Sequence, residues 1–217
     1  MTSGDAPAVR LLLEKTDARL GLDNPSCELG STPLQMAVYT NNSDIFAALL
    51  EAGAATEVHD NLGWTALTMA AEWGRDSMVA ALLAAGAALE AETPSGWRPL
   101  HIAAVNGHAS TVEVLLTAGA ALEAEDNNGW RALHAAAMNG HGPVLAMLIA
   151  AGADLAAATK EGEDALKLAN SGFHSGAVSY ILAQGERRTW GKDLSPFSMN
   201  WLYILFHCPP RSTSQEP

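Results

Sequence analysis

Five glycines recur at an unbroken spacing of 33 residues, and this period constrains the fold more than any other feature of the chain. They are Gly30, Gly63, Gly96, Gly129 and Gly162. A second series keeps the same step, and its members are Gly53, Gly86, Gly119 and Gly152. Self-similarity at one fixed period indicates an array in which each copy is one supersecondary unit that packs on its neighbours.

The central copy, residues 95–125, shows how each unit is built. An opening turn is followed by Pro99, which suits the first turn of a helix because its missing N–H is not needed there. This first helix stops at Gly107, and a second helix is expected to open at Thr111 and end at Gly119. Isolated helices below about 12–15 residues are marginal in water, so each helix pair needs a neighbour.

Large apolar residues and alanines keep the same period and predict the core. One leucine recurs in each first helix, at Leu34, Leu67, Leu100, Leu133 and Leu166. Apolar pairs recur in the second helices, at 49–50, 82–83, 115–116 and 148–149. Alanine fills the places where helix pairs approach closely, as at Ala70 and Ala71. Burying one such leucine is worth roughly 1.5–3 kcal/mol.

The period and three short motifs resemble the ankyrin repeat. The motifs are Thr32-Pro33-Leu34, Pro99-Leu100-His101 and the Leu-Leu-x-x-Gly-Ala runs at 49–54, 82–87 and 115–120. The resemblance covers residues 28–185. It implies an all-α, ankyrin-repeat solenoid of stacked helix-turn-helix units with projecting β-turn loops, and a role in protein interaction rather than catalysis.

The array is expected to hold five repeats with a segment on either side. The repeats span residues 28–59, 60–92, 93–125, 126–158 and 159–185. Residues 1–27 form an N-terminal segment in which residues 9–20 are predicted to make a half-repeat capping helix. The fifth repeat is more polar, as a terminal copy should be, and its second helix is expected over 177–182.

Residues 186–217 form a C-terminal tail that does not continue the period. Its short apolar run, residues 199–208, either docks on the last repeat, binds a partner or is poorly ordered. No stretch of the chain approaches the ~20 apolar residues that a membrane-spanning helix requires.

The net charge limits the classes of partner, and the number and positions of the cysteines indicate the redox state of the compartment. The formal net charge of -12 argues against an electrostatic grip on nucleic-acid phosphates. Cys27 and Cys208 lie outside the repeat cores, so a disulfide framework is not expected and a reducing compartment is favoured. We therefore expect an intracellular, cytoplasmic monomer, with the nucleus as an alternative location.

The sequence predicts no catalytic, cofactor-binding or metal site. It has no phosphate-binding glycine loop, no nucleophile elbow and no Cys/His pair within one repeat. His101 and His134 are one repeat apart, as are His108 and His141. Stacked helices lie ~8–10 Å apart, whereas two ligands of one Zn²⁺ each sit ~2.0–2.1 Å from the metal. The histidines are therefore predicted to be structural.

The resemblance implies that histidines such as His101 and His134 bond the backbone and a neighbouring threonine hydroxyl. Here Arg98 and Arg131 replace that threonine, so part of the expected network is open.

Three tryptophans directly follow turn glycines, and we call Trp64, Trp97 and Trp130 the turn row. The resemblance places them on projecting turns that face the concave side, where partners of the family usually bind. Two interpretations remain open. Each indole packs on its neighbour's turn and stiffens the row, or the row is an exposed aromatic strip of the kind found at interface hot spots.

An acidic pattern runs beside the turn row. Its two registers are Glu57, Glu90 and Glu123, and Glu92 and Glu125. Tryptophan faces flanked by carboxylates suit a Lys- or Arg-bearing segment, so a basic peptide is one partner hypothesis. Against it, Arg98 and Arg131 adjoin two of the tryptophans and could neutralise the glutamates internally.

By the same resemblance, the ends of the first helices also face the concave side. The residues there are Tyr39, Thr40, Glu72, Trp73, Val105, Asn106, Met138 and Asn139. Trp73 is the most suggestive, because it is a large aromatic at a place that usually faces solvent. The predicted function is a non-enzymatic protein–protein interaction module. The alternative is a regulatory or inhibitory adaptor anchored through residues 199–208.

Overall fold

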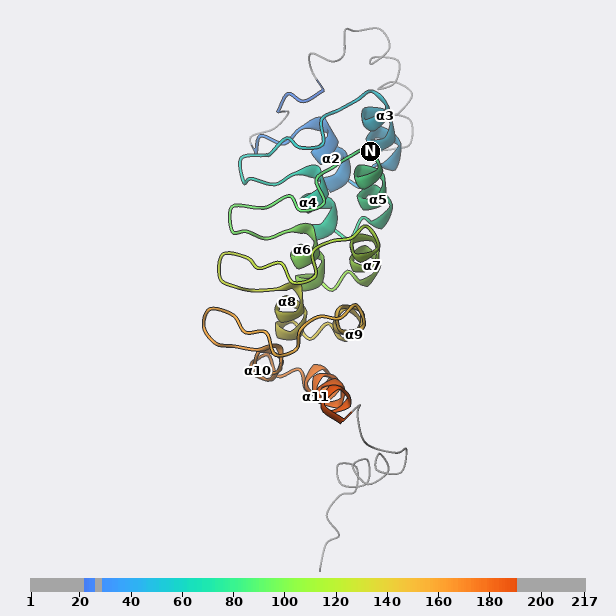
Figure 1. Ribbon diagram of the computed structural model, residues 1–217. Coiled ribbons are helices and arrows are strands. Elements are labelled where there is room, and N and C mark those ends of the chain that lie inside the picture. Colours follow the sequence, from blue (N-terminus) through green and yellow to red (C-terminus); the bar gives the residue numbers. More distant parts are fainter. Residues whose placement is uncertain (1–21, 26–28, 191–217) are drawn as a thin grey trace, which may run out of the picture. The chain divides into compact units, whose positions relative to one another are not determined.

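The computed structural model describes residues 22–25 and 29–190, with side chains described up to residue 185 (Figure 1). Ten helices and no strand lie in this part of the chain. The first helices of the repeats are α2 (Pro33–Tyr39), α4 (Ala66–Glu72), α6 (Pro99–Val105), α8 (Ala132–Met138) and α10 (Ala165–Ser171). The second helices are α3 (Ser43–Glu51), α5 (Asp76–Ala84), α7 (Ala109–Thr117), α9 (Gly142–Ala150) and α11 (Ser175–Trp190).

The chain separates into two compact units, residues 1–181 and residues 182–217. Within the first unit, α2, α4, α6, α8 and α10 pack in succession, and α5, α7 and α9 form a second column (Figure 1). Between successive helix pairs a hairpin-like loop projects to one side. The predicted all-α stack of helix pairs with projecting loops is confirmed.

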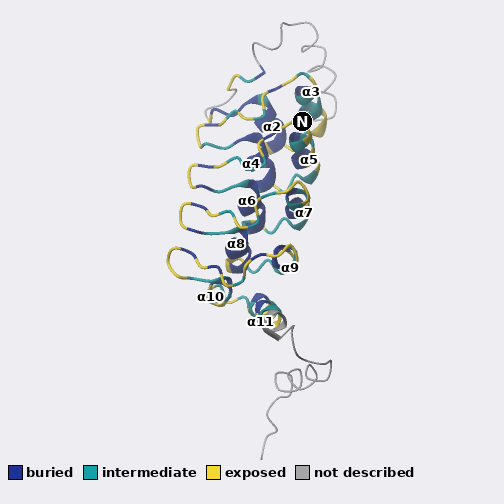
Figure 2. Cartoon of the chain, in the orientation of Figure 1, coloured by how far each residue is buried: buried dark blue, intermediate teal, exposed yellow. Residues whose placement is uncertain are grey.

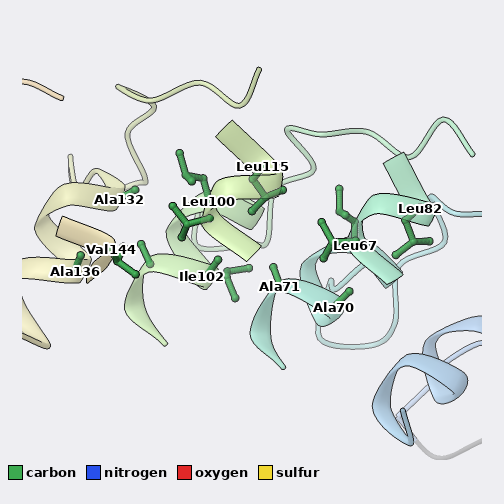
Figure 3. Packing of buried hydrophobic residues seen from close by; sticks show 14 of the residues in the cluster. Leu67, Ala70, Ala71, Leu82, Leu100, Ile102, Leu115, Ala132, Ala136 and Val144 are labelled. Carbon is green, nitrogen blue, oxygen red and sulfur yellow. The ribbon is translucent and has the colours of Figure 1, made fainter. Parts of the chain in front are cut away.

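One apolar core runs through the stack without interruption (Figure 2). Figure 3 shows how it is assembled, with Leu67, Leu100 and Leu115 filling the space between helices and Ala70 and Ala71 allowing close approach. These side chains are buried, as the period predicted. Four predicted core residues are only half-buried. Three are the second members of the apolar pairs in the second helices, Leu50, Leu83 and Leu116. The fourth is Leu166, which belongs to the last repeat and is covered by no further copy.

Thr32 and Gln35 begin the first repeat with a reciprocal cap. The Thr32 hydroxyl accepts the Gln35 backbone N–H at 3.3 Å, and Gln35 Oε1 accepts the Thr32 N–H at 2.7 Å. This arrangement satisfies two donors at the start of α2 that have no partner inside the helix. Later repeats have other residues at one or both of these positions, so the cap of the first helix is not the same in every repeat.

Gly96 shows why the 33-residue glycine series is needed. Its φ of +80° lies in the left-handed region, and a Cβ there would sit 2.9 Å from the backbone nitrogen of Asn127 in the next repeat. A side chain would therefore strain the turn and push the neighbouring repeat away.

Two helix boundaries predicted from the sequence are wrong. Helix α7 begins at Ala109, two residues before the predicted Thr111, and His108 is its N-cap residue. The second helix of the fifth repeat, expected over 177–182, runs from Ser175 to Trp190 and passes through Gly185. This repeat lacks the Gly-Ala step that turns the chain back in the other copies, so the helix continues. The predictions for residues 9–20 and 199–208 lie outside the described residues.

Candidate partner-binding surfaces

A carboxylate shapes the projecting loop that carries each of two turn-row tryptophans. Asp126 Oδ1 accepts the backbone N–H groups of Asn128 and Trp130, each at 2.7 Å. Asp60 holds Leu62 and Trp64 in the same way, at 2.9 and 2.8 Å. These hydrogen bonds give the loop's backbone N–H groups the acceptors that a neighbouring strand would otherwise provide. The backbone of Trp64 and of Trp130 is therefore held by a carboxylate of its own loop.

The indoles of the turn row are half-buried rather than fully exposed. Trp97 Nε1 donates to Asp126 Oδ2 of the next repeat at 2.8 Å. Trp130 meets the imidazole of His134 edge to face, with ring centroids 6.4 Å apart. Trp64 and Trp97 also pack against the core. This geometry supports the interpretation in which the indoles stiffen the row, and it leaves part of each ring at the surface.

Arg98 and Arg131 each hold two glutamates beside the turn row. Arg98 Nη1 lies 3.0 Å from Glu90 Oε2, and Arg98 Nη2 lies 2.8 Å from Glu92 Oε1. Arg131 repeats the arrangement with Glu123 and Glu125. A cationic partner at this place would therefore compete with an arginine that is already bound.

The first acidic register also connects successive repeats. Glu90 Oε1 accepts the backbone N–H of Ala121 at 2.8 Å, and Glu123 Oε1 accepts that of Asp154 at 2.9 Å. Glu57 does the same for Ala88 at 3.0 Å. Sequence reasoning treated these glutamates as a surface for partners and missed this structural use. In the sequence, each glutamate lies 31 residues before the residue whose backbone N–H it accepts, and this constant interval was the available sign of the contact.

His101 and His134 keep their backbone bonds although arginine replaces the neighbouring threonine. His101 Nδ1 accepts the Arg98 N–H at 3.3 Å, and Nε2 lies 3.0 Å from the carbonyl oxygens of Ala124 and Trp130. His134 likewise accepts from Arg131 and donates to Ala157. Because Nδ1 accepts a hydrogen, the ring is the neutral form with its proton on Nε2.

Burial lowers the pKa of both imidazoles. The pKa of His101 lies below its ordinary value mainly because burial disfavours the charged ring. The same cause lowers the pKa of His134, and the positive charge of Arg131 acts in the same direction. Hydrogen bonds from Nε2 to carbonyl oxygens oppose the shift in both cases without reversing it.

A second column of histidines joins each helix pair to the one before it. His108 Nε2 donates to the Glu72 carbonyl oxygen at 2.9 Å, and His141 and His174 repeat the contact with Val105 and Met138. All five histidines of the two columns thus bond the backbone. No group of three His, Cys, Asp or Glu side chains suited to a metal ion occurs in the described part of the chain.

The carboxyl ends of α2 and α4 bring Tyr39 and Trp73 together at the surface. Their ring centroids lie 5.6 Å apart with the planes at 83°, an edge-to-face contact. Tyr39 is 55% exposed and Trp73 is 46% exposed. Glu72, the residue before Trp73, accepts an N–H of Asn106 Nδ2 in the next repeat through Oε2 at 2.8 Å. We call Tyr39, Glu72 and Trp73 the tip surface.

At the carboxyl ends of the next two first helices, Val105 of α6 is half-buried and Met138 of α8 is exposed. Sequence reasoning missed Phe173, which is 93% exposed and has a φ of +59°. Glycine fills the equivalent places at Gly74, Gly107 and Gly140. The sequence sign was a phenylalanine at a position that is glycine in the three preceding repeats. The last repeat tolerates this side chain because no later copy packs over it.

Comparison with known proteins identifies the family. A family model described as ankyrin repeats (3 copies) matches residues 1–93 and 86–159. A search of curated proteins finds no match to the chain. In the described residues, no helix combines the length and apolar character needed to cross a bilayer. Proteins of the matched family generally mediate protein–protein interaction and are typically non-enzymatic. With five stacked helix pairs in a 33-residue period, the chain belongs to the ankyrin repeat family.

Proposed function

We propose that this chain is a non-enzymatic binding module that holds a partner protein or peptide in the concave groove and on the turn face of its ankyrin stack. The observation that carries the proposal is the tip surface, where Tyr39 and Trp73 are each about half exposed. Their rings touch each other. Tryptophan and tyrosine are enriched at interface hot spots because they offer a large apolar area with a polar edge.

Preorganisation is the physical mechanism of this function. His108 and His101 donate hydrogen bonds to carbonyl oxygens of neighbouring repeats, and Glu90 accepts one from a neighbouring N–H. These bonds join the second repeat to the third and the third to the fourth, so surface side chains are presented at fixed intervals. A partner that meets such a surface loses its own freedom but does not have to order the receptor. The turn row contributes rigid, half-exposed indoles to the same task.

We propose that the protein acts inside the cell as a monomer. The positions of Cys27 and Cys208 outside the repeat cores support a reducing compartment.

Affinity capture from a native lysate tests the proposal. The bait is the full chain, compared with a Tyr39→Ala/Trp73→Ala variant and a Trp64/Trp97/Trp130 triple alanine variant. Phe173→Ala is a matched control, because it removes an exposed aromatic at the last repeat. We expect one or more proteins that the wild type and the control retain and that at least one of the two surface variants loses.

Circular dichroism of each bait must show the same helical content, since Trp97 makes an inter-repeat bond and its loss weakens the stack. A set of captured proteins identical for all four folded baits would contradict the proposal.

A further inference from the structure

We propose that the tip surface receives a cationic side chain, an arginine or a lysine, from the partner segment. Tyr39 and Trp73 supply two adjoining aromatic rings, and Glu72, the residue before Trp73, supplies a carboxylate. The inference rests on the proposed function and narrows it to one chemical class of contact.

The aromatic part of the site is the Tyr39–Trp73 pair. In an edge-to-face contact one ring offers its edge and the other its face, so π surface remains outside the contact. Tyr39 and Trp73 are each about half exposed, so part of their surface faces solvent. A guanidinium or ammonium group within about 6 Å of an indole centroid is attracted by the ring quadrupole.

The carboxylate of Glu72 directly precedes Trp73 and is held in place. Asn106 Nδ2, from the next repeat, donates to Glu72 Oε2 at 2.8 Å. A carboxylate has about four acceptor sites, so this single bond leaves capacity for the two parallel N–H groups of an arginine. A carboxylate on the residue next to an exposed indole favours a cation over a neutral apolar side chain.

The charge of the chain points the same way. The formal net charge is -12, and an acidic surface attracts a basic segment. Most cations among the described side chains are already engaged within the array. Arg98 and Arg131 hold glutamates, Lys167 lies 3.3 Å from Glu163, and Lys160 Nζ donates to the Asn127 carbonyl at 2.8 Å.

The turn row is a poorer place for the same cation. Its glutamates already bind Arg98 and Arg131, and Trp97 Nε1 is bonded to Asp126. A partner's arginine would have to displace a bound arginine there. At the tip surface the partner's arginine would meet Glu72 instead. The hydrogen-bond partner of Glu72 in the structure is the neutral amide of Asn106, so no bound arginine has to be displaced.

Arg75 is the cation nearest in sequence to the tip surface, two residues after Trp73. Its Nε is buried without a hydrogen-bond partner, whereas the imidazole at the equivalent place, His108, donates to a carbonyl oxygen. Its positive charge opposes a cationic partner and would assist an anionic one. Arg75 therefore distinguishes the two chemistries.

Display of random dodecapeptides against the folded full chain tests the inference without a known partner. We expect enrichment of peptides with arginine or lysine at one fixed position. Each enriched peptide is then synthesised together with a matched neutral form, in which citrulline replaces arginine or acetyl-lysine replaces lysine. Titration by fluorescence anisotropy at about 0.15 M salt compares the two forms, and the neutral form should bind at least tenfold more weakly.

Four variants locate the contact. Trp73→Ala should weaken the cationic peptide roughly two- to thirtyfold, the range that cation–π contacts span. Glu72→Gln, which keeps the shape, should weaken it several-fold. Arg75→Gln should tighten it several-fold, and Phe173→Ala should leave it unchanged.

Peptides without a cation, neutral forms that bind equally well, or weaker binding to Arg75→Gln would each overturn the inference. So would a failure to enrich any cation-dependent peptide. Peptides that depend on Trp130 but not on Trp73 would also overturn it, and they would leave the proposed function standing. The capture experiment judges that function separately.

Discussion

His101 joins the third repeat to the fourth through a hydrogen bond in which its Nε2 lies 3.0 Å from the carbonyl oxygen of Trp130. The other ring nitrogen accepts the backbone N–H of Arg98. A protonated ring carries hydrogens on both nitrogens and would direct one of them at the Arg98 N–H. The contact therefore requires neutral histidine, and His134 makes the equivalent arrangement one repeat on.

The first prediction is that the stack loses stability as the pH falls below about 6.5. Burial lowers the pKa of His101 and His134 in the folded chain, while the unfolded chain protonates them near 6.5. Below that pH the unfolded state binds more protons, so the free energy of unfolding decreases towards the folded pKa. Each histidine contributes at most about 1.4 kcal/mol per pH unit.

Gln35 supplies the control for this prediction. It occupies the equivalent place in the first repeat, does not titrate, and donates from Nε2 to the carbonyl oxygens of Val58 and Trp64 at 2.9 and 2.7 Å. Urea unfolding at pH 7.5 and 5.5 should show a smaller loss for the His101→Gln/His134→Gln variant than for the wild type. Equal losses would show that other groups set the pH dependence.

The second prediction separates strain from inter-repeat packing at two glycines. Gly107 and Gly119 both have positive φ, +73° and +89°. A Cβ at Gly107 would lie 2.5 Å from His141 Nδ1, whereas at Gly119 it would meet nothing within 4 Å. Gly119→Ala should cost about 1–2 kcal/mol from left-handed strain. Gly107→Ala should cost about 1 kcal/mol more, because His141 must move and its bond to Val105 is weakened.

Thermal unfolding followed by circular dichroism measures both variants, with ΔΔG evaluated at the melting temperature. If the two substitutions lowered stability equally, packing of His141 on Gly107 would contribute nothing beyond the backbone strain.

The third prediction concerns Asn41 and Arg75, which stand where later repeats pair a glycine with a histidine. Asn41 has a φ of 54°, and Arg75 leaves its buried Nε without a hydrogen-bond partner. Replacing both, as Asn41→Gly/Arg75→His, should stabilise the stack by about 1 kcal/mol, because the new imidazole can donate to a carbonyl oxygen.

A double-mutant cycle in urea checks this coupling. Arg75→His alone should gain less than the pair, since the Cβ of Asn41 occupies the space that the ring takes in later repeats. Additive single effects would contradict the pairing.

The fourth prediction compares two glutamates that share one arginine. Glu123 pairs with Arg131 and also accepts the Asp154 backbone N–H, whereas Glu125 contacts Arg131 at the surface. Glu125→Ala should cost at most about 1 kcal/mol and lose its effect in 1 M NaCl. Glu123→Ala should cost about 1 kcal/mol more and keep most of it at high salt, because a neutral N–H loses its acceptor.

Glu123→Gln is the matched variant, since it removes the charge and retains an oxygen for Asp154. It should resemble Glu125→Ala in size and in salt dependence. A Glu123→Gln loss as large as that of Glu123→Ala would show that the ion pair, and not the link between repeats, stabilises this position.

The sequence by itself determined the repeat, its helices and its core. The 33-residue period repeats one local pattern, and turn glycines, helix starts such as Pro99 and apolar positions such as Leu115 are all decided within one copy. The length of the last helix was predicted wrongly because no further repeat comes after α11. Without another loop to turn the chain, the helix continues through Gly185 to Trp190.

The tertiary structure alone decided how side chains of different repeats meet. Tyr39 and Trp73 are 34 residues apart, so the 33-residue period does not align them, yet their rings touch. The sequence pattern assigned Glu90 to the surface, but stacking brings the Ala121 N–H to it. Such contacts depend on the distance and rotation between one repeat and the next. A period along the chain states which residues are equivalent, and packing in space decides which of them touch.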